Sequence, residues 1–170
     1  MLEKQVEAGK IAYYGVATWS AFRLSEGARD YMSLADLEAL ARSAGGGQHH
    51  FRFVQLPFNL AMPEAFGLAN QRVEKQKMSL LSAASELGIA VVGSATLHQG
   101  RLTSGMPDFV RGILGLHTDA ENAIQFSRSA PGLVTALVGM SQKEHVAANV
   151  KVAAVPPTRQ EEWSRLFTKA

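Results

Sequence analysis

The sequence predicts an α/β protein whose strands run parallel in one sheet. Four apolar segments recur at similar intervals along the 170 residues, and helical patterns stand between them. The apolar residues of these segments run nearly without interruption, which is typical of strands covered on both faces. Repeated βα units of this length favour either a doubly wound sheet or part of a (β/α)8 barrel. A complete barrel needs about 250 residues and eight strands, so the chain falls short of one.

The first part of the chain predicts two strands around a helix. Met1–Lys10 has the composition of a helix tail leading into a strand at Ile11–Ala17, so we expect the chain to open in mid-fold. Leucines at helical spacing predict a helix over Ser33–Ala44, which ends at a flexible loop, Gly45–Gly47. The second strand is expected at Phe51–Pro57.

The middle of the chain predicts a longer helix and a third strand. Apolar residues share one face over Gln71–Leu87, and the glycine that follows is typical of a helix C-terminus. The third strand is expected at Ile89–Ser94. A weaker pattern predicts a helix over Ala120–Ser129, before a fourth strand at Leu133–Gly139.

Within Thr135–Asn149, the fourth strand runs through a glycine into a helix. Ser141 and Glu144 match the Ser-x-x-Glu capping box that defines a helix start. A strand that stops at a helix N-terminus leaves backbone N–H groups facing outward, where a phosphate can bind. His145 and Asn149 lie four residues apart on one side of this helix. The spacing alone also fits an ordinary βα unit without a ligand.

The end of the chain predicts one more helix. Pro156 and Pro157 mark a break, and Thr158 with Glu161 matches a second capping box. The face of this helix that docks on the rest of the protein is expected to consist of Trp163, Leu166 and Phe167.

Composition and charge exclude several classes of protein. No run of about 18 apolar residues and no signal-peptide pattern occurs, so we expect a soluble protein without membrane partners. The chain has no cysteine, which excludes disulfides and thiolate sites and favours a cytoplasmic location. Its net charge of +2 is scattered without a basic stripe, so nucleic acid is not an expected partner.

Five sequence segments together resemble a known family. They are Gly9–Thr18, Gln55–Asn59, Gly88–Leu102, Arg128–Pro131 and Ala136–Asn149. In this order and spacing they resemble strands five to eight of the aldo-keto reductases, NAD(P)H-dependent oxidoreductases built on a (β/α)8 barrel. The resemblance implies a partial TIM barrel, the (β/α)4 C-terminal half with a C-terminal helix, as a single domain over residues 1–170.

The resemblance also implies a binding site for a nicotinamide dinucleotide at the C-terminal ends of the strands. Gln55 would bond the nicotinamide carboxamide, although it could instead satisfy buried backbone groups. The loop Leu97–Leu102 would pass over the pyrophosphate, unless it is an ordinary βα turn. Asn149 would face adenine. The expected cofactor-binding residues are Thr18, Gln55, Ser94, Leu97, Gln99, Gly100, Leu102, Gly139, Met140, Ser141, Lys143, His145 and Asn149.

The chain departs from the family pattern at several of these positions. Ala17 and Thr18 replace the usual Ser-Asn, and Ser94 stands where an aromatic ring commonly stacks on the nicotinamide. Ala148 replaces an acidic or amide residue, and His145 replaces an arginine that often meets the 2′-phosphate. Imidazole holds that phosphate less firmly than guanidinium, so NAD is also possible as the cofactor. NADP is the expected cofactor because the family generally uses it.

No catalytic residue is expected in this chain. The family's tetrad of Asp, Tyr, Lys and His lies on the first four strands, and nothing here matches them. Tyr13, Tyr14 and Tyr31 are interpreted as structural, because none stands in the motif of the proton donor. The five histidines show no metal-ligand spacing, so no metal site is expected.

Two functions remain open from the sequence. In the first, the chain supplies the cofactor-binding half of an NAD(P)H-dependent aldo-keto reductase, which reduces carbonyls by hydride transfer, and is inactive alone because it lacks a general acid. In the second, it is a non-catalytic binding or assembly module. A half barrel exposes two unpaired strand edges, so either function predicts pairing with another copy or with a complementary N-terminal half. The carbonyl substrate is not specified by the sequence.

Overall fold

The computed structural model describes residues 1–168, which form two compact units. The first unit consists of Met1–Leu56 with Glu64–Val92, and the second of Pro57–Pro63 with the chain from Gly93 onward. The expectation of a single domain over residues 1–170 stays a prediction. No helix in the described part of the chain is both long and apolar enough to cross a membrane.

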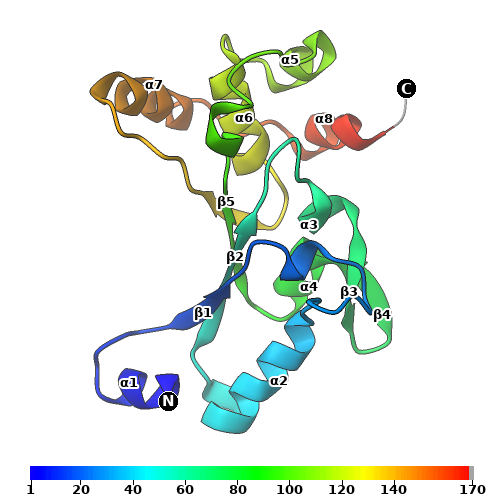
Figure 1. The fold of residues 1–170 in the computed structure, drawn as a ribbon, viewed down its shortest axis with the longest axis vertical. Helices are drawn as coiled ribbons and strands as arrows, with labels where there is room; N and C mark the ends of the chain where they lie inside the picture. The colour runs from blue at the N-terminus through cyan, green and yellow to red at the C-terminus, as the bar shows by residue number, and fades with distance from the viewer. Residues whose placement is uncertain (169–170) are drawn as a thin grey trace. The chain divides into compact units, whose positions relative to one another are not determined.

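Four strands form the main sheet, in the order β1, β2, β5, β6 (Figure 1). Their bounds are β1 (Tyr14–Ala17), β2 (Phe51–Pro57), β5 (Ala90–Ser94) and β6 (Leu133–Ala136). Strands β1 and β2 pair in parallel, with Ala17 opposite Gln55. At Gly15 a side chain would overlap the backbone oxygen of Phe53, so the close approach of these strands requires glycine. The predicted α/β class and parallel sheet are confirmed, with β1 and β6 shorter than expected.

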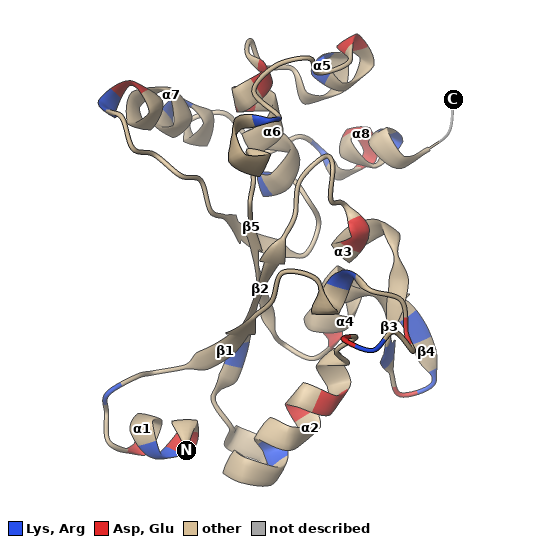
Figure 2. Cartoon of the chain, viewed as in Figure 1, with Lys and Arg blue, Asp and Glu red and all other residues tan. Residues whose placement is uncertain are grey.

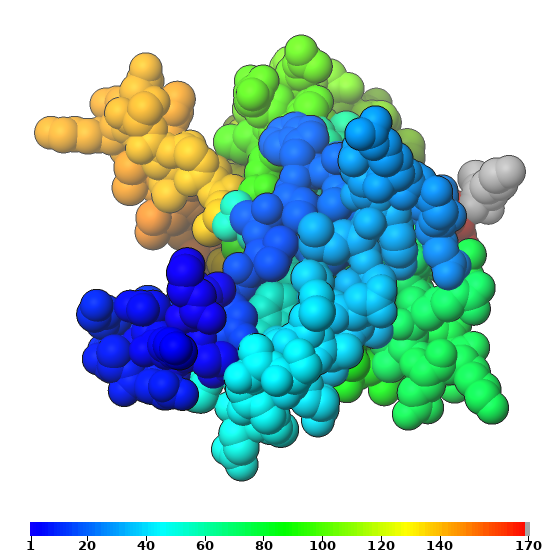
Figure 3. Space-filling model, turned by 60° about the horizontal axis from the view of Figure 1, so that its bottom comes forward, coloured from blue at the N-terminus to red at the C-terminus, as the bar shows by residue number. Residues whose placement is uncertain are grey.

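The first unit contains the predicted helix that follows β1. Helix α2 (Leu34–Gly45) begins after Ser33, whose hydroxyl accepts a hydrogen bond of 3.2 Å from the Asp36 N–H. Short turns of 3-10 helix lie at Ala21–Arg23 and Gly46–Gln48. The N-terminal helix α1 (Leu2–Glu7) lies against the C-terminal end of α2 (Figure 3). Both predicted helices are therefore confirmed.

The prediction of one helix over Gln71–Leu87 is wrong in its first half. Strands β3 (Ala69–Val73) and β4 (Gln76–Ser79) form an antiparallel hairpin there, packed beside α3 (Glu64–Gly67) and α4 (Leu80–Glu86) (Figure 1). Gln71 is buried, and its side-chain oxygen accepts from the Leu34 N–H at 2.8 Å. Ser79 caps α4 by accepting from the Ser82 N–H, so only the second half of the pattern is helical.

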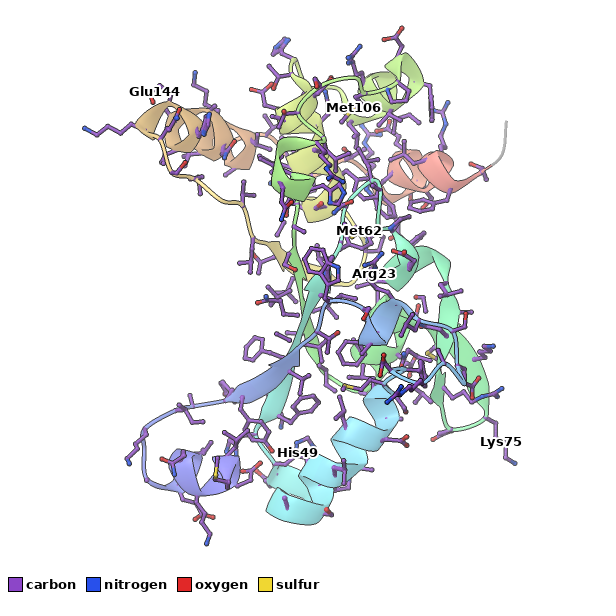
Figure 4. The ribbon with its side chains drawn as sticks, viewed as in Figure 1. Arg23, His49, Met62, Lys75, Met106 and Glu144 are labelled. Carbon is purple, nitrogen blue, oxygen red and sulfur yellow. The ribbon has the colours of Figure 1, made fainter. Side chains whose placement is uncertain are left out.

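The second unit carries four helices among its described residues. They are α5 (Asp108–Leu114), α6 (Asp119–Arg128), α7 (Lys143–Ala153) and α8 (Gln160–Ser164), followed by a 3-10 turn at Arg165–Phe167. Helix α6 confirms the predicted helix, and it starts at a capping box of Thr118 and Glu121 that the sequence analysis missed. Met106 lies beside α6 (Figure 4), where its N–H donates to Asp119 at 3.0 Å.

Both capping boxes predicted in this unit are wrong. Helix α7 starts after Gln142, one residue later than expected, and no side-chain hydrogen bond caps it. Helix α8 starts after Arg159, also without such a bond. The hydroxyl of Thr158 accepts from Gln125 at 3.2 Å, and the Thr158 N–H donates to Ser129 at 2.9 Å. Tertiary contacts therefore use the groups that the motif assigned to the helix start.

Aromatic packing forms the core of the second unit. Trp163 is fully buried, and its Nε1–H donates to the backbone oxygen of Phe126 at 2.8 Å. The ring of Phe126 stacks on Trp163 at 5.2 Å and on Phe58 at 5.5 Å between centroids. Phe167 completes the group beside Trp163. The predicted docking of this C-terminal segment through Trp163 is confirmed.

Candidate functional site

A pocket of about 790 Å³ lies in the second unit, between the loop after β5 and the segment that enters α7. Its walls come from residues 95–103 and 137–149, with one residue of α6. The pocket brings together these predicted cofactor-binding residues: Leu97, Gln99, Gly100, Gly139, Met140, Ser141, His145 and Asn149. Two segments about forty residues apart in sequence thus form one concave site, as small-molecule sites require.

The other predicted residues do not line this pocket. Thr18 and Gln55 belong to the first unit, where the Thr18 N–H donates to the Gln55 carbonyl at 2.9 Å. Ser94 ends β5 and accepts from a backbone N–H with its carbonyl. Leu102 lines a separate, mainly apolar pocket of about 430 Å³, and Lys143 is exposed at the start of α7. Roles for these five residues in cofactor binding stay predictions.

Two side-chain hydrogen bonds hold the start of the loop after β5. Asn59 donates to the Ala95 carbonyl at 2.9 Å, and the Thr96 hydroxyl donates to the Leu137 carbonyl at 2.8 Å. Thr96 is buried, so its hydroxyl ties the loop to the segment that follows β6. The two walls of the pocket are therefore linked directly by a hydrogen bond.

The backbone of this loop turns through left-handed conformations. Ala95, His98 and Gln99 have φ of 54°, 46° and 56°, and Gly100 has φ of 84°. Three of these four residues are not glycine, and each such conformation costs about 1–3 kcal/mol. Strain of this kind concentrates at functional sites.

Most backbone N–H groups of the loop bond within the loop itself. The His98 N–H donates to Ala95 at 2.7 Å, the Gly100 N–H to Leu97 at 2.9 Å and the Arg101 N–H to His98 at 3.1 Å. A group that already donates to a carbonyl is a poorer donor to a ligand. A ligand in the pocket therefore meets side chains on this wall more than backbone N–H groups.

The titratable side chains of the pocket lining are two histidines, His98 and His145. No Lys, Arg, Asp or Glu of the described residues lines it. Charged residues lie at the ends of α7 (Figure 2), and Glu144 marks its first turn (Figure 4). That turn has no side-chain cap, so its N–H groups are available to an acceptor such as a phosphate oxygen.

His98 is a pocket residue that the sequence analysis did not select. Its side chain lines the pocket, and its Nδ1 atom is buried without a hydrogen-bond partner. The sequence around His98 matches no motif that would have identified it as a binding residue. Its left-handed backbone and its unpaired ring nitrogen are visible only in three dimensions.

The tyrosines have structural partners. The Tyr14 hydroxyl donates to Glu3 at 2.7 Å, and burial together with this bond raises the pKa of Tyr14 to about 12. The Tyr31 hydroxyl donates to the Asn70 carbonyl at 2.6 Å. A raised pKa is the opposite of what a tyrosine proton donor needs, and the structural interpretation of the tyrosines stays a prediction. No cluster of three metal-ligating side chains occurs among the described residues.

Solved structures share this architecture. No protein-family model matches the sequence, and no curated protein does so. An aldo-keto reductase from Bacillus halodurans, AKR11C1 in its holo form, matches 97% of this chain with a TM-score of 0.64 at 16% identity. The chain has the fold of half an aldo-keto reductase.

Two further aldo-keto reductases give the same result. One from Klebsiella pneumoniae, solved in complex with NADP and acetate, matches 96% of the chain with a TM-score of 0.64 at 24% identity. The thermostable Tm1743, solved with the inhibitor epalrestat, matches 97% with a TM-score of 0.60 at 18% identity. This chain covers 50–52% of the length of these three aldo-keto reductases. The predicted half barrel is thereby confirmed, and its assignment to the C-terminal half stays a prediction.

Proposed function

We propose that this chain is the cofactor-binding half of an aldo-keto reductase. It holds a nicotinamide dinucleotide for hydride transfer to an aldehyde or ketone and lacks the groups that protonate the substrate. The pocket of the second unit carries the proposal, because it gathers residues that the family resemblance assigns to the pyrophosphate and adenosine ends of the cofactor. The uncapped first turn of α7 at this pocket supports binding of a phosphate.

Titration with NADPH tests the proposal. We expect saturable binding by the chain alone, seen as a change in nicotinamide fluorescence and as a higher melting temperature. Replacing Asn149 by alanine is expected to weaken binding up to about tenfold, because one hydrogen bond is lost. Gln160→Ala, at an exposed position outside the pocket, is the matched control and should leave affinity unchanged.

Turnover assays complete this test. The chain alone is expected to oxidise no NADPH when an aldehyde is added, because loss of a general acid removes about 10²–10⁴ in rate. Failure to bind NADPH, or aldehyde reduction by the chain alone, contradicts the proposal. NADPH is expected to bind more tightly than NADH, by a modest factor because His145 replaces an arginine.

We also propose that the chain pairs with a second copy or with a complementary half barrel. Apolar side chains are exposed in both units. Val134 and Val150 are 65% and 59% exposed in the second, and Tyr13 and Phe53 are 54% and 41% exposed in the first. Exposed apolar groups beside the outer strands of an open sheet are typical of surfaces that a partner covers.

Sedimentation of the purified chain tests pairing. We expect the wild-type chain to self-associate, and we expect Val150→Glu to shift it toward the monomer, because a charge replaces an apolar group that is buried on pairing. Lys151→Glu, an exposed change at the next position of α7, is the control. A stable wild-type monomer with no shift in either variant contradicts pairing with a second copy.

A further inference from the structure

His98 adopts a backbone conformation that a side chain rarely tolerates. Its φ is 46°, and the next residue is also left-handed. Glycine reaches this region without a steric penalty, whereas other residues do not. The chain therefore carries an imidazole at a position where glycine would serve the turn better. Residues held in such conformations cluster at binding and active sites.

The two nitrogens of the His98 ring have different surroundings. Nδ1 is buried and unpaired, while Nε2 is not among the buried unpaired atoms, and His98 is one of the residues that line the pocket. A neutral imidazole has one N–H group. Burying an N–H without an acceptor costs more than burying a lone pair without a donor. The favoured tautomer therefore carries its proton on Nε2, the nitrogen that remains accessible.

The lining of the pocket makes such a donor useful. No cation among the described residues lines it, and the N–H groups of the adjacent loop are largely used within the loop. Besides the N–H groups of the first turn of α7, an anion bound there depends on side-chain donors such as the Ser141 hydroxyl and the imidazoles of His98 and His145. Of these, His98 lies on the wall formed by the loop.

We propose that His98 donates its Nε2–H to an anionic phosphoryl oxygen of the nucleotide bound in this pocket. The inference rests on the proposed function in naming a dinucleotide as the ligand. His98 is thus a binding residue. Its N–H group contacts the phosphate in a pocket whose lining contains no Lys or Arg among the described residues. The phosphate chemistry, rather than the nicotinamide, is what His98 recognises.

Binding measurements with two probes test this role. Affinities for NADPH and for inorganic pyrophosphate are measured with wild type, His98→Ala and His98→Gln. We expect His98→Ala to weaken both about tenfold or more, as for a hydrogen bond to a charged oxygen, and His98→Gln to recover part of the loss through its amide N–H. His117→Ala, which removes an exposed histidine outside the pocket, should change neither.

Thermal unfolding separates a binding role from a structural one. His98→Gly removes the ring and relieves the left-handed strain, so we expect weaker binding without a lower melting temperature. Equal affinities of wild type and His98→Ala for both probes overturn the role of His98 and leave the proposed function intact. Pyrophosphate binding that depends on His98, without NADPH binding, supports the role and overturns the dinucleotide function. Binding of neither probe overturns both.

Nitrogen NMR of the histidine rings gives an answer that needs no ligand. We expect the His98 ring to carry its proton on Nε2 in the free protein, and we expect the Nε2 signal to move when pyrophosphate is added. A proton on Nδ1 in the free protein overturns the inference, because the ring would then present a lone pair to the phosphate.

Discussion

Replacing Trp163 by alanine is expected to cost about 3–5 kcal/mol of unfolding free energy, the range for deleting a large buried aromatic side chain. Trp163 is fully buried, and its ring packs on Phe126 and Phe167. The variant also leaves the backbone oxygen of Phe126 without the indole donor. Because domains are only marginally stable, a loss of this size unfolds much of the second unit, including the pocket.

Urea denaturation followed by circular dichroism measures this loss without relying on tryptophan fluorescence. Trp19→Ala is the matched control, since Trp19 is 59% exposed and the sequence has only these two tryptophans. The control is expected to change stability by less than about 0.5 kcal/mol. We also expect Trp163→Ala to lose nucleotide binding while Trp19→Ala retains it. A loss below about 1 kcal/mol for Trp163→Ala would show that this aromatic core is not the main support of the unit.

Replacing Asn70 by alanine is expected to cost about 2–4 kcal/mol, because it leaves two carbonyls without a donor. Asn70 is 2% exposed, and its side-chain nitrogen donates to the carbonyls of Phe22 and Leu24, each at 2.8 Å. These bonds join β3 to the segment after β1, across more than forty residues of sequence. The variant should therefore loosen the hairpin and the loop before α2 together.

Asn70→Asp separates the hydrogen bonds from the packing. It keeps the volume but replaces the donor with an acceptor that faces two carbonyls, so it is expected to destabilise the protein at least as much as alanine. Arg72→Ala on the same strand removes an exposed ion pair with Glu26 at 2.8 Å, and its effect on stability is expected to be small because solvent screens the pair. Equal, small losses for Asn70 and Arg72 variants in urea denaturation would contradict the role of Asn70.

The apolar pattern predicted the strands of the main sheet well. Phe51–Pro57 agrees at both ends with β2, and Ile89–Ser94 differs from β5 by one residue. Buried parallel strands need apolar side chains on both faces, so their sequence signal is local and strong. Helix α2 was also predictable, because its N-cap, Ser33, bonds within its own first turn.

The hairpin of β3 and β4 and the capping boxes show where local patterns fail. The apolar pattern over Gln71–Leu87 that predicted a helix also fits a strand whose polar residues are buried. The hydrogen-bond partners that bury Asn70 and Gln71 are distant in sequence, so a local pattern does not show them. Thr158 matched a capping motif, but its bonds go to Gln125 and Ser129 of another element. A motif reports which bonds a residue can make, while tertiary packing decides which ones it makes.

The sequence by itself determined the αβ repeat, because burial and backbone propensities act between neighbouring residues. The half-barrel fold and most residues of the pocket followed from the resemblance to the aldo-keto reductases. Only the tertiary structure decided the hairpin, the start of α7 and the selection of His98 as a pocket residue. These depend on hydrogen bonds and on burial between segments far apart in the chain, such as Thr96 with Leu137. A pattern of adjacent residues does not show which distant group will form a hydrogen bond with a given side chain.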